Sequence, residues 1–312
     1  MRSLKRLVVV VGTVCAVVVP LRVTASPPAA VRPPIFHPPA PYYLALGDSL
    51  AFGFQEAKFL QELSTGTYDP ATFNTGYDAD FAAMIRPLAP GGHAFSEVNY
   101  GCPGETTASM IRGGCPFHNA TIDFRLHNDY LVSASQLQVA IAFLQAHPHQ
   151  VNPITLDIGA NDILNLLSNC NANPTCISNH LAGTIATMRA HLDWILSALR
   201  SVAPGAEMLA INVPDPFQFS APASLPAFAA FNRALDAVVA RHGVRLVDAF
   251  AAVQKLDEAT FCKLSAVCTP PLFDIHPTDA GYAALAQSLW TASGYVLHPE
   301  LDSGRRAGVT QR

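Results

Sequence analysis

Five short apolar runs, separated by longer segments with helical spacing, constrain the fold of this chain more than any other feature. The runs lie at residues 42–46, 95–100, 154–158, 208–213 and 244–247. Their nearly continuous hydrophobicity is typical of strands that are buried on both faces. The helical segments lie at residues 79–88, 135–146, 177–202, 227–241 and 278–293. Strands that alternate with helices in this way predict an α/β fold, with a mostly parallel sheet covered by helices on both sides.

Two connections between these segments are long and irregular. Residues 55–77 and 112–129 are rich in Gly, Asn, Thr and aromatic residues and show no convincing helical pattern. Long irregular loops in a compact domain are commonly functional. Because sheets of this type bind ligands at the carboxyl ends of their strands, we expect these connections to border a substrate cleft.

The N-terminal segment has the pattern of a secretory signal peptide. Basic residues within positions 1–6 precede an apolar run at 7–21, and small residues follow it. A retained membrane helix needs about 20 apolar residues, and Pro20 with Arg22 interrupts this run. We predict export, removal of the signal near Ala25, and no stable membrane anchor.

Composition divides the rest of the chain into three parts. After the signal peptide at 1–25 we expect a proline-rich leader at 26–41, a single α/β domain at 42–302 and a polar tail at 303–312. The net charge is −4, only 13% of residues are charged, and the sequence has no basic stripe. We therefore expect no nucleic-acid partner and a monomer whose surface suits uncharged or lipid-like substrates.

The seven cysteines fit an exported protein. Cys15 lies in the predicted signal, and the other six fall into three local couples. Short separation along the chain favours disulfides within these couples, and disulfides persist outside the cytosol. No couple has the tight spacing and neighbouring histidines of a zinc site, so we expect no metal. The predicted pairs are Cys102–Cys115, Cys170–Cys176 and Cys262–Cys268.

A first polar cluster, Gly47-Asp48-Ser49-Leu50, directly follows the first expected strand. Gly47 permits a tight turn that exposes the Ser49 hydroxyl, although a serine in such a place is more commonly a helix cap. A chymotrypsin-like protease does not fit, because its serine follows its histidine and aspartate in the chain. An α/β-hydrolase elbow does not fit either, because the second glycine of that motif is missing.

The second and third clusters carry groups that can hold an oxyanion. Residues 99–106, Asn-Tyr-Gly-Cys-Pro-Gly-Glu-Thr, include Gly101 and Gly104, which can bring backbone N–H groups close to a ligand. Residues 157–162, Asp-Ile-Gly-Ala-Asn-Asp, include Asn161, whose side-chain amide can donate to an oxyanion. Taken singly, each pattern is more commonly a turn or a helix cap.

The fourth cluster, residues 274–282, lies at the start of the last expected helix and contains His276. Pro277 keeps His276 out of that helix, and Thr278 can cap it. The histidine then stands on a loop at a helix start, which suits a general base. The chain has 11 histidines, and any one of them is more commonly structural or exposed than catalytic.

Together, in their order and contexts, the four clusters resemble the four conserved blocks of the GDSL/SGNH hydrolase superfamily, named for its Ser, Gly, Asn and His. The resemblance spans residues 43–287 and is greatest with secreted actinobacterial-type esterases and lipases. It implies a flavodoxin-like three-layer α/β/α sandwich with a five-stranded parallel sheet and no cofactor. It also implies Ser49 as nucleophile, His276 as base, and an oxyanion hole formed by the Ser49 and Gly104 amides with the Asn161 side chain.

The chain departs from the superfamily just before the histidine. The superfamily usually has an aspartate three residues before it, where this chain has Phe273, and here Asp274 stands two residues before His276. Side chains at i and i+2 of an extended segment point to the same side, so Asp274 can orient the imidazole. Alternatively, Asp274 is a loop or capping residue and a backbone carbonyl orients the ring, since some members of the superfamily have no acidic third member.

These residue types imply hydrolysis of a carboxylic ester through an acyl-enzyme on Ser49. Two other functions fit the sequence: a catalytically silent exported protein that binds lipid or glycan, and acyl transfer to an alcohol in place of water. Lipid esters, short acyl esters and acylated sugars are all compatible substrates. Phe52 and Phe54, beside Ser49, are candidates for an acyl pocket, although aromatic residues at that spacing more commonly belong to the core.

Overall fold

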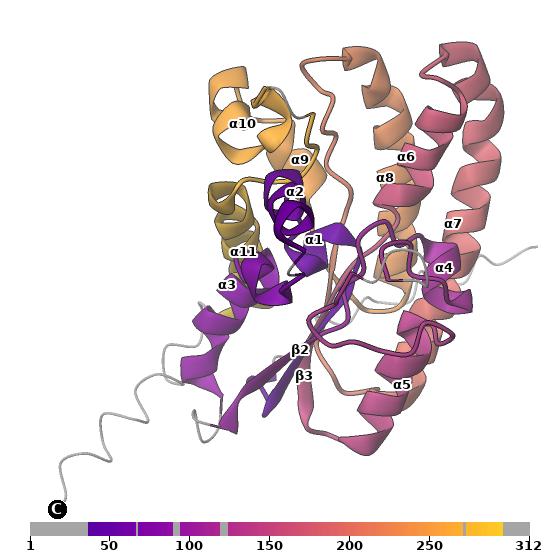
Figure 1. Cartoon of the computed structure of the whole chain (residues 1–312). Coiled ribbons are helices and arrows are strands. Elements are labelled where there is room, and N and C mark those ends of the chain that lie inside the picture. The colour runs from indigo at the N-terminus through magenta and orange to yellow at the C-terminus, as the bar shows by residue number, and fades with distance from the viewer. Residues whose placement is uncertain (1–36, 67, 90–93, 119–123, 271–272, 296–312) are drawn as a thin grey trace, which may run out of the picture. The chain divides into compact units, whose positions relative to one another are not determined.

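The structure, a computed structural model, describes residues 37–66, 68–89, 94–118, 124–270 and 273–295. Within these ranges five strands alternate with helices (Figure 1), so the predicted α/β class is confirmed. The predicted signal peptide, most of the leader, the end of the predicted domain and the polar tail lie outside the described residues. The strands are β1 (Tyr42–Gly47), β2 (Ser96–Asn99), β3 (Val151–Asp157), β4 (Met208–Ile211) and β5 (Arg245–Val247).

All neighbouring strands are parallel, in the order β2-β1-β3-β4-β5. This is the flavodoxin-like order, in which the direction of winding reverses between β1 and β3. Ligands bind outside the carboxyl ends of the strands at such a junction. Ser49 follows β1 and Asn161 follows β3, so the topology itself brings these two predicted site residues to one place.

Each central strand is buried on both faces, because helices cover both sides of the sheet (Figure 1). Leu44 and Leu46 of β1 pack into one core, whereas Tyr43 and Ala45 pack into the other. On the first side lie α4 (Thr107–Arg112), α5 (Gln136–Ala146), α6 (Ala160–Asn169), α7 (Pro174–Val202) and α8 (Leu225–Arg241). On the second side lie α1 (Ser49–Phe52), α3 (Tyr77–Ile85), α9 (Ala249–Val253) and α11 (Asp279–Ser293).

The expectation that residues 55–77 form no helix is wrong. They contain α2 (Glu56–Thr65) and the 3-10 turn η1 (Pro70–Phe73). Its apolar residues Phe59, Leu60 and Leu63 do have helical spacing, but the pattern covers little more than one turn and is too short to predict a helix by itself. The remaining elements are α10 (Glu258–Leu264) and the 3-10 turns η2 (Arg86–Leu88), η4 (Pro222–Ser224) and η5 (Ala266–Cys268).

The described end of the leader, residues 37–41, lies against the domain. Asn152 donates hydrogen bonds through Nδ2 to the carbonyls of His37, at 3.2 Å, and Pro38, at 2.9 Å. The Asn152 carbonyl accepts a third from the N–H of Ala40, at 2.9 Å. Among the helices in the described ranges, none is long and apolar enough to cross a membrane.

Candidate active site

A cleft of about 200 Å³ opens at the carboxyl ends of the strands, and all four polar clusters reach it. Its lining includes Ser49 after β1, Gly104 after β2, Asn161 in the first turn of α6, and His276 before α11. The structure therefore brings together four residues that are up to 227 positions apart in the sequence.

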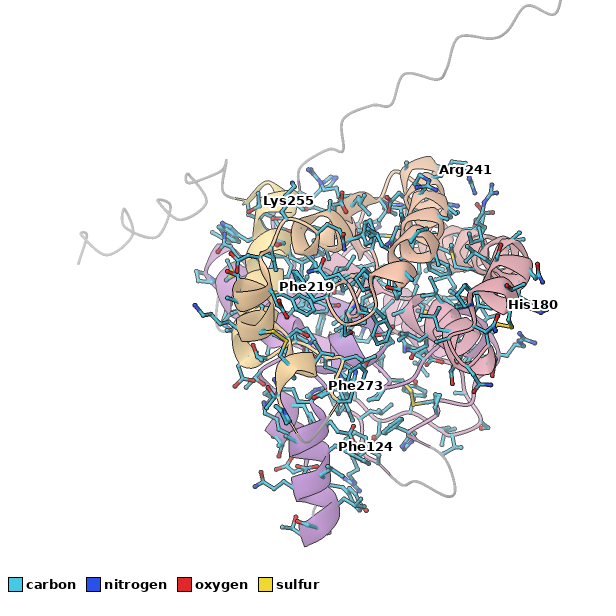
Figure 2. All side chains as sticks on the ribbon, turned by 90° about the horizontal axis from the view of Figure 1, so that it is seen from above. Phe124, His180, Phe219, Arg241, Lys255 and Phe273 are labelled. Atoms are coloured by element: carbon cyan, nitrogen blue, oxygen red, sulfur yellow. A yellow bond between two sulfur atoms is a disulfide. The ribbon has the colours of Figure 1, made fainter. Side chains whose placement is uncertain are left out.

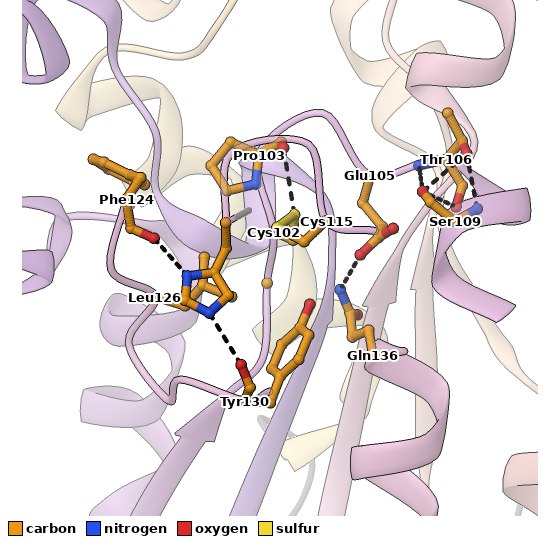
Figure 3. Close-up of a disulfide and its surroundings, with 12 residues drawn as sticks. Cys102, Pro103, Glu105, Thr106, Ser109, Cys115, Phe124, Leu126, Tyr130 and Gln136 are labelled. Carbon is orange, nitrogen blue, oxygen red and sulfur yellow. Dashed lines mark hydrogen bonds between the residues drawn. A yellow bond between two sulfur atoms is a disulfide. The ribbon is translucent and has the colours of Figure 1, made fainter. Parts of the chain in front are cut away.

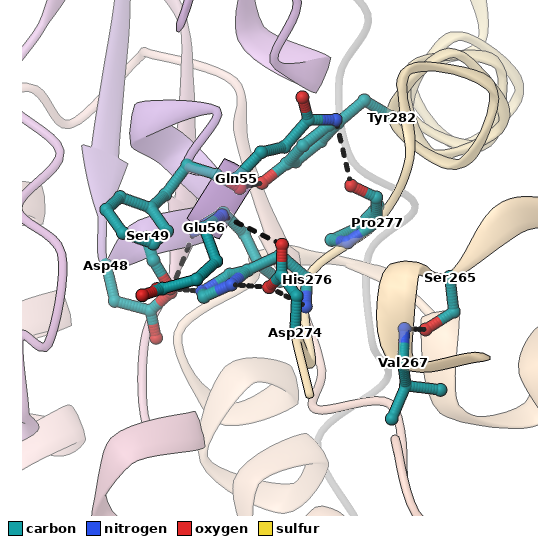
Figure 4. A network of polar contacts seen from close by, with 12 residues as sticks. Asp48, Ser49, Gln55, Glu56, Ser265, Val267, Asp274, His276, Pro277 and Tyr282 are labelled. Atoms are coloured by element: carbon teal, nitrogen blue, oxygen red, sulfur yellow. Dashed lines mark hydrogen bonds and ion pairs between the residues drawn. The ribbon is translucent and has the colours of Figure 1, made fainter. Parts of the chain in front are cut away.

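His276 lies between Ser49 and Asp274 (Figure 4). Its Nε2 is 2.9 Å from Ser49 Oγ, and its Nδ1 is 2.6 Å from Asp274 Oδ1. The Asp274 carboxylate also accepts hydrogen bonds from the backbone N–H groups of His276, at 3.0 Å, and Glu56, at 2.8 Å. Burial by itself would raise the pKa of Asp274, but the hydrogen bonds and the imidazole hold that pKa below its ordinary value. An ionised Asp274 keeps the ring proton on Nδ1 and leaves Nε2 free to accept from Ser49.

The loop that carries His276 is held by its neighbours on both sides. The His276 carbonyl accepts a hydrogen bond from Ala266 N–H at 2.9 Å, and the imidazole packs on Phe54 with ring centroids 4.9 Å apart. Thr278 caps α11 by accepting from Gly281 N–H, so the helix begins only after the histidine. Phe54 and Phe52 both belong to a buried aromatic cluster with Phe73 and Phe124, and of the two only Phe54 also lines the cleft.

The turn after β1 is fixed by buried carboxyl groups beneath it. Asp48 caps α1 by accepting a hydrogen bond from Leu50 N–H at 3.1 Å. Asp157, at the end of β3, accepts from Ala51 N–H at 3.2 Å and from the Tyr77 hydroxyl at 2.7 Å. Burial and the adjacent Asp48 raise the pKa of Asp157 well above its ordinary value. Burial raises the pKa of Asp48 as well, and two charges side by side in this buried place are unfavourable, so we infer that the two carboxyl groups share one proton.

Gln136, at the start of α5, connects the turns after β1 and β2 by hydrogen bonds, of which Figure 3 shows the one to Glu105. Its side chain accepts from Gly47 N–H at 2.7 Å and donates to the Gly47 carbonyl at 2.8 Å and to Glu105 Oε2 at 3.2 Å. Burial raises the pKa of Glu105 to about 7. The Glu105 carbonyl accepts from Asn161 Nδ2 at 2.9 Å. One chain of hydrogen bonds thus connects the turns after β1, β2 and β3.

Glycine is needed at the two positions of the second cluster for different structural reasons. Gly104 has a φ of +81°, a conformation that side chains rarely adopt, and it lies in the cleft wall. At Gly101, a Cβ would lie 2.7 Å from the Phe52 nitrogen. Gly101 therefore allows close packing against α1, and only Gly104 faces the cleft.

Three disulfides join the six cysteines of the domain, each within a local couple. Cys102–Cys115 closes the loop that carries Gly104 (Figure 3). Cys262–Cys268 spans the end of α10 and η5, beside the His276 loop, and Cys170–Cys176 joins the end of α6 to the start of α7. Across the part of the chain that the structure describes, no group of three or more His, Cys, Asp or Glu residues is placed to hold a metal ion.

The buried residues that hold the turn after β1 in place were not predicted from the sequence. Asp157 ends a strand that is buried along its whole length, and an acidic residue there must have partners inside the protein. That signal was present in the sequence. Nothing local, in contrast, marks Gln136 or Tyr77, whose partners lie 89 and 80 positions away.

The strand order, and the cleft that the four polar clusters reach at the β1–β3 junction, define an α/β protein of the flavodoxin-like class. Residues 45–284 match the model of the GDSL-like lipase/acylhydrolase family. The chain belongs to this family and is an ester hydrolase.

Solved structures with a similar fold include two Streptomyces enzymes. The phospholipase A1 from Streptomyces albidoflavus NA297 is 19% identical, with a TM-score of 0.53 over 81% of this chain and 99% of that chain. The extracellular lipase from Streptomyces rimosus is 22% identical, with a TM-score of 0.52 over 80% of this chain and 99% of that chain. At these identities the likeness shows a common fold. A search of curated proteins found no match.

Proposed function

We propose that the protein is a secreted carboxylic-ester hydrolase in which Ser49 is the nucleophile, His276 the general base and Asp274 the residue that orients it. One observation carries this proposal, a series of two hydrogen bonds. The first joins Ser49 Oγ and His276 Nε2 at 2.9 Å, and the second joins His276 Nδ1 and Asp274 Oδ1 at 2.6 Å. A general base must lie within about 2.6–3.2 Å of the proton that it takes. The second distance favours Asp274 over a backbone carbonyl as the partner of the imidazole.

In acylation, Ser49 Oγ attacks the ester carbonyl carbon while its proton passes to His276 Nε2. The ionised Asp274 stabilises the imidazolium that forms. His276 then gives this proton to the alcohol oxygen, and the carbon–oxygen bond to the alcohol breaks. Water repeats the same steps on the acyl-enzyme and releases the acid, which restores Ser49.

The oxyanion of the tetrahedral intermediate would lie between Ser49, Gly104 and Asn161. Ser49 is the first residue of α1, so its N–H has no partner within the helix. Gly104 lines the cleft from the second turn. The Asn161 amide carries two N–H donors, of which one is bound to the Glu105 carbonyl. That bond orients the side chain and leaves the second donor for the oxyanion.

Covalent labelling tests the assignment of Ser49. A fluorophosphonate should modify Ser49 and stop hydrolysis of p-nitrophenyl butyrate, and Ser49→Ala should fold, resist labelling and lose about 10⁴-fold or more in kcat. Ser64→Ala removes an exposed serine of α2 and should behave as wild type. An adduct on another serine would refute the assignment. Acyl transfer to an added alcohol without hydrolysis would indicate an acyltransferase, and a protein that is neither labelled nor active would indicate a binding protein.

We also propose that the protein is exported and that residues 1–25 are removed. The support is the basic and apolar pattern at the start of the sequence, together with three disulfides in the described part of the chain. Expressed as the full chain in a secreting bacterial host, the protein in the medium should begin near Ser26 by N-terminal mass spectrometry. Protein retained in cells with residues 1–25 intact would contradict export.

A further inference from the structure

Two apolar hollows adjoin the cleft, formed by helices that lie on opposite sides of Figure 1. The first, which we call the α6–α7 groove, has a volume of about 640 Å³, and its larger apolar side chains are Leu164, Leu167, Ile177, Leu181 and Phe217. The second, the α9–α11 pocket, has a volume of about 220 Å³, and its larger apolar side chains include Leu256, Phe261, Leu264, Ile275 and Leu285. Each shares lining residues with the cleft: Leu164 belongs also to the groove, and Leu50, Pro214, Pro216 and Ile275 belong also to the pocket.

The lining of the α6–α7 groove suits a hydrocarbon chain. None of the described residues that line it is Asp, Glu, Lys, Arg or His, so no charged side chain there would neutralise a phosphate or a charged headgroup; the polar groups of the lining are Ser168, Asn171, Ser178 and Ser224. Leu164, Leu167, Ile177 and Leu181 are only partly buried, and covering them with an apolar chain removes their surface from water. The volume falls in the range of about 300–1,000 Å³ that is usual for ligand sites.

The position of His276 determines whether the alcohol part or the acyl part of an ester faces the α9–α11 pocket, and which part faces the α6–α7 groove. Because His276 must protonate the departing alcohol oxygen, the alcohol arm lies on the side of the histidine. Ile275 and Pro277, the two neighbours of His276, both line the α9–α11 pocket. On the oxyanion side, Asn161 stands in the first turn of α6, and Leu164 follows three residues later on the same face of the helix, where the groove begins.

We propose that the α6–α7 groove binds the acyl chain of the substrate, and that the protein prefers esters of medium- and long-chain fatty acids over acetyl esters. The inference rests on the proposed function, because it takes its direction from Ser49 as nucleophile and His276 as the acid that protonates the leaving group. The far end of the groove is the turn closed by Cys170–Cys176, within which Asn171, Ala172 and Pro174 contribute to the lining.

An aromatic row forms the junction between cleft and groove. Phe228 lines the cleft, Phe217 lines the groove, and their ring centroids are 6.3 Å apart. Phe273 stacks on the outer face of Phe217, with centroids 6.1 Å apart and planes 7° from parallel. Buried Asp215 fixes Phe217 by accepting from its N–H at 2.9 Å and from the Ser224 hydroxyl at 2.8 Å.

Phe273 is 64% exposed (Figure 2), a large apolar side chain presented to solvent beside the cleft. It occupies the position at which the superfamily usually has an aspartate. In this chain Asp274 already contacts His276, so Phe273 is available to extend the apolar wall outward from Phe217. An exposed aromatic residue at this place is consistent with an incoming fatty-acyl chain.

A chain-length series of p-nitrophenyl esters, from acetate to palmitate, tests the proposal on the mature exported protein. For the wild type, kcat/KM should rise beyond butyrate, by up to about fourfold for each methylene that the groove buries. Ser178→Trp and Ala223→Trp place a large ring in the groove from exposed positions on α7 and η4. Each should lower the laurate-to-butyrate ratio of kcat/KM tenfold or more.

A matched control comes from the other hollow. Ala284 is an exposed residue of α11 that lines the α9–α11 pocket, and Ala284→Trp should leave the laurate-to-butyrate ratio as in the wild type. A ratio that falls in Ala284→Trp but not in the two groove variants would place the acyl chain in the pocket and overturn the inference. A wild-type enzyme that is labelled at Ser49 but shows no preference for long chains would also overturn it, while leaving the proposed function intact. Failure of the proposed function is distinguishable, because it would appear as absent labelling and no hydrolysis of any ester in the series.

Discussion

The two sides of the candidate active site are held in different ways. The turn that carries Ser49 is built into the sheet, and the polar side chains that fix it are almost fully buried: Asp48, Asp157, Tyr77 and Gln136. The loop that carries His276 lies outside the sheet. It is held by Asp274, whose carboxylate accepts from the N–H groups of Glu56 and His276, and by the His276 carbonyl, which accepts from Ala266 N–H.

Substitutions on the two sides should therefore differ in how strongly they lower the free energy of unfolding and the turnover. Removing a buried polar partner beneath Ser49 would leave its neighbours unsatisfied inside the protein, so the free energy of unfolding should fall. Asp274 is buried as well, and an amide in its place can accept only through its oxygen, so some stability is also lost on the His276 side. We therefore expect substitutions on the Ser49 side to lower mainly the stability, and Asp274→Asn to lower mainly the turnover.

The largest effect should come from Asp274→Asn. An amide cannot stabilise the imidazolium and can favour the wrong ring tautomer, so kcat on p-nitrophenyl butyrate should fall by about 10⁴-fold. The protein should stay folded with a lower melting temperature, because the amide nitrogen faces one of the backbone N–H groups that the carboxylate binds. Asp279→Asn is the matched control, because this carboxylate lies three residues beyond His276 and is mostly exposed. It should cost less than tenfold. If Asp274→Asn keeps most of its kcat, a backbone carbonyl becomes the better candidate for orienting His276.

Next in size is the effect of Asp157→Ala on stability. The substitution leaves Asp48, the Tyr77 hydroxyl and Ala51 N–H without their buried partner. The free energy of unfolding in urea should fall by about 3–5 kcal/mol. Asp157→Asn retains a donor toward Asp48 and an acceptor for Tyr77, and it should cost clearly less. Equal losses for alanine and asparagine would show that the shared proton and its hydrogen bonds do not stabilise the turn.

The smallest effect is a change in the pH dependence of stability in Glu105→Gln. Burial raises the Glu105 pKa from 4.5 to about 7, so the folded state holds this proton more tightly than the unfolded state does. The Glu105 contribution to wild-type stability should therefore be fully present below about pH 4.5 and be lost as the pH rises to about 7. The variant lacks this loss and should exceed the wild type by roughly 2–3 kcal/mol at pH 8, with no difference at pH 4.

Urea unfolding at several pH values measures this difference. Glu258→Gln, a substitution at an exposed position in the first turn of α10, should follow the wild-type curve. Parallel curves for Glu105→Gln and the wild type across this range would contradict the prediction.

The sequence by itself was sufficient to predict the parallel sheet and to place the polar clusters at the ends of its strands. Strands buried on both faces need continuous apolar runs, and the predicted starts of β1 and β4 agree with the structure at Tyr42 and Met208. Residues at the end of a strand lie at one edge of a parallel sheet, so Ser49, Gly104 and Asn161 could be expected to meet. The proximity of Asp274 to His276 also follows from local geometry, because the two are only two residues apart.

What the sequence could not determine depends on contacts between distant segments. The apolar pattern of the helix α2 covers little more than one turn, and the place of this helix beside the cleft is set by contacts such as that between Phe59 and Phe117. The pairing of Asp48 with Asp157, and the stacking of Phe217 on Phe273, join residues that no local pattern relates. The α6–α7 groove likewise exists only where two helices and a loop meet. Hydrophobic patterning acts within one element, whereas these features arise from the packing of several, and only the tertiary structure decides them.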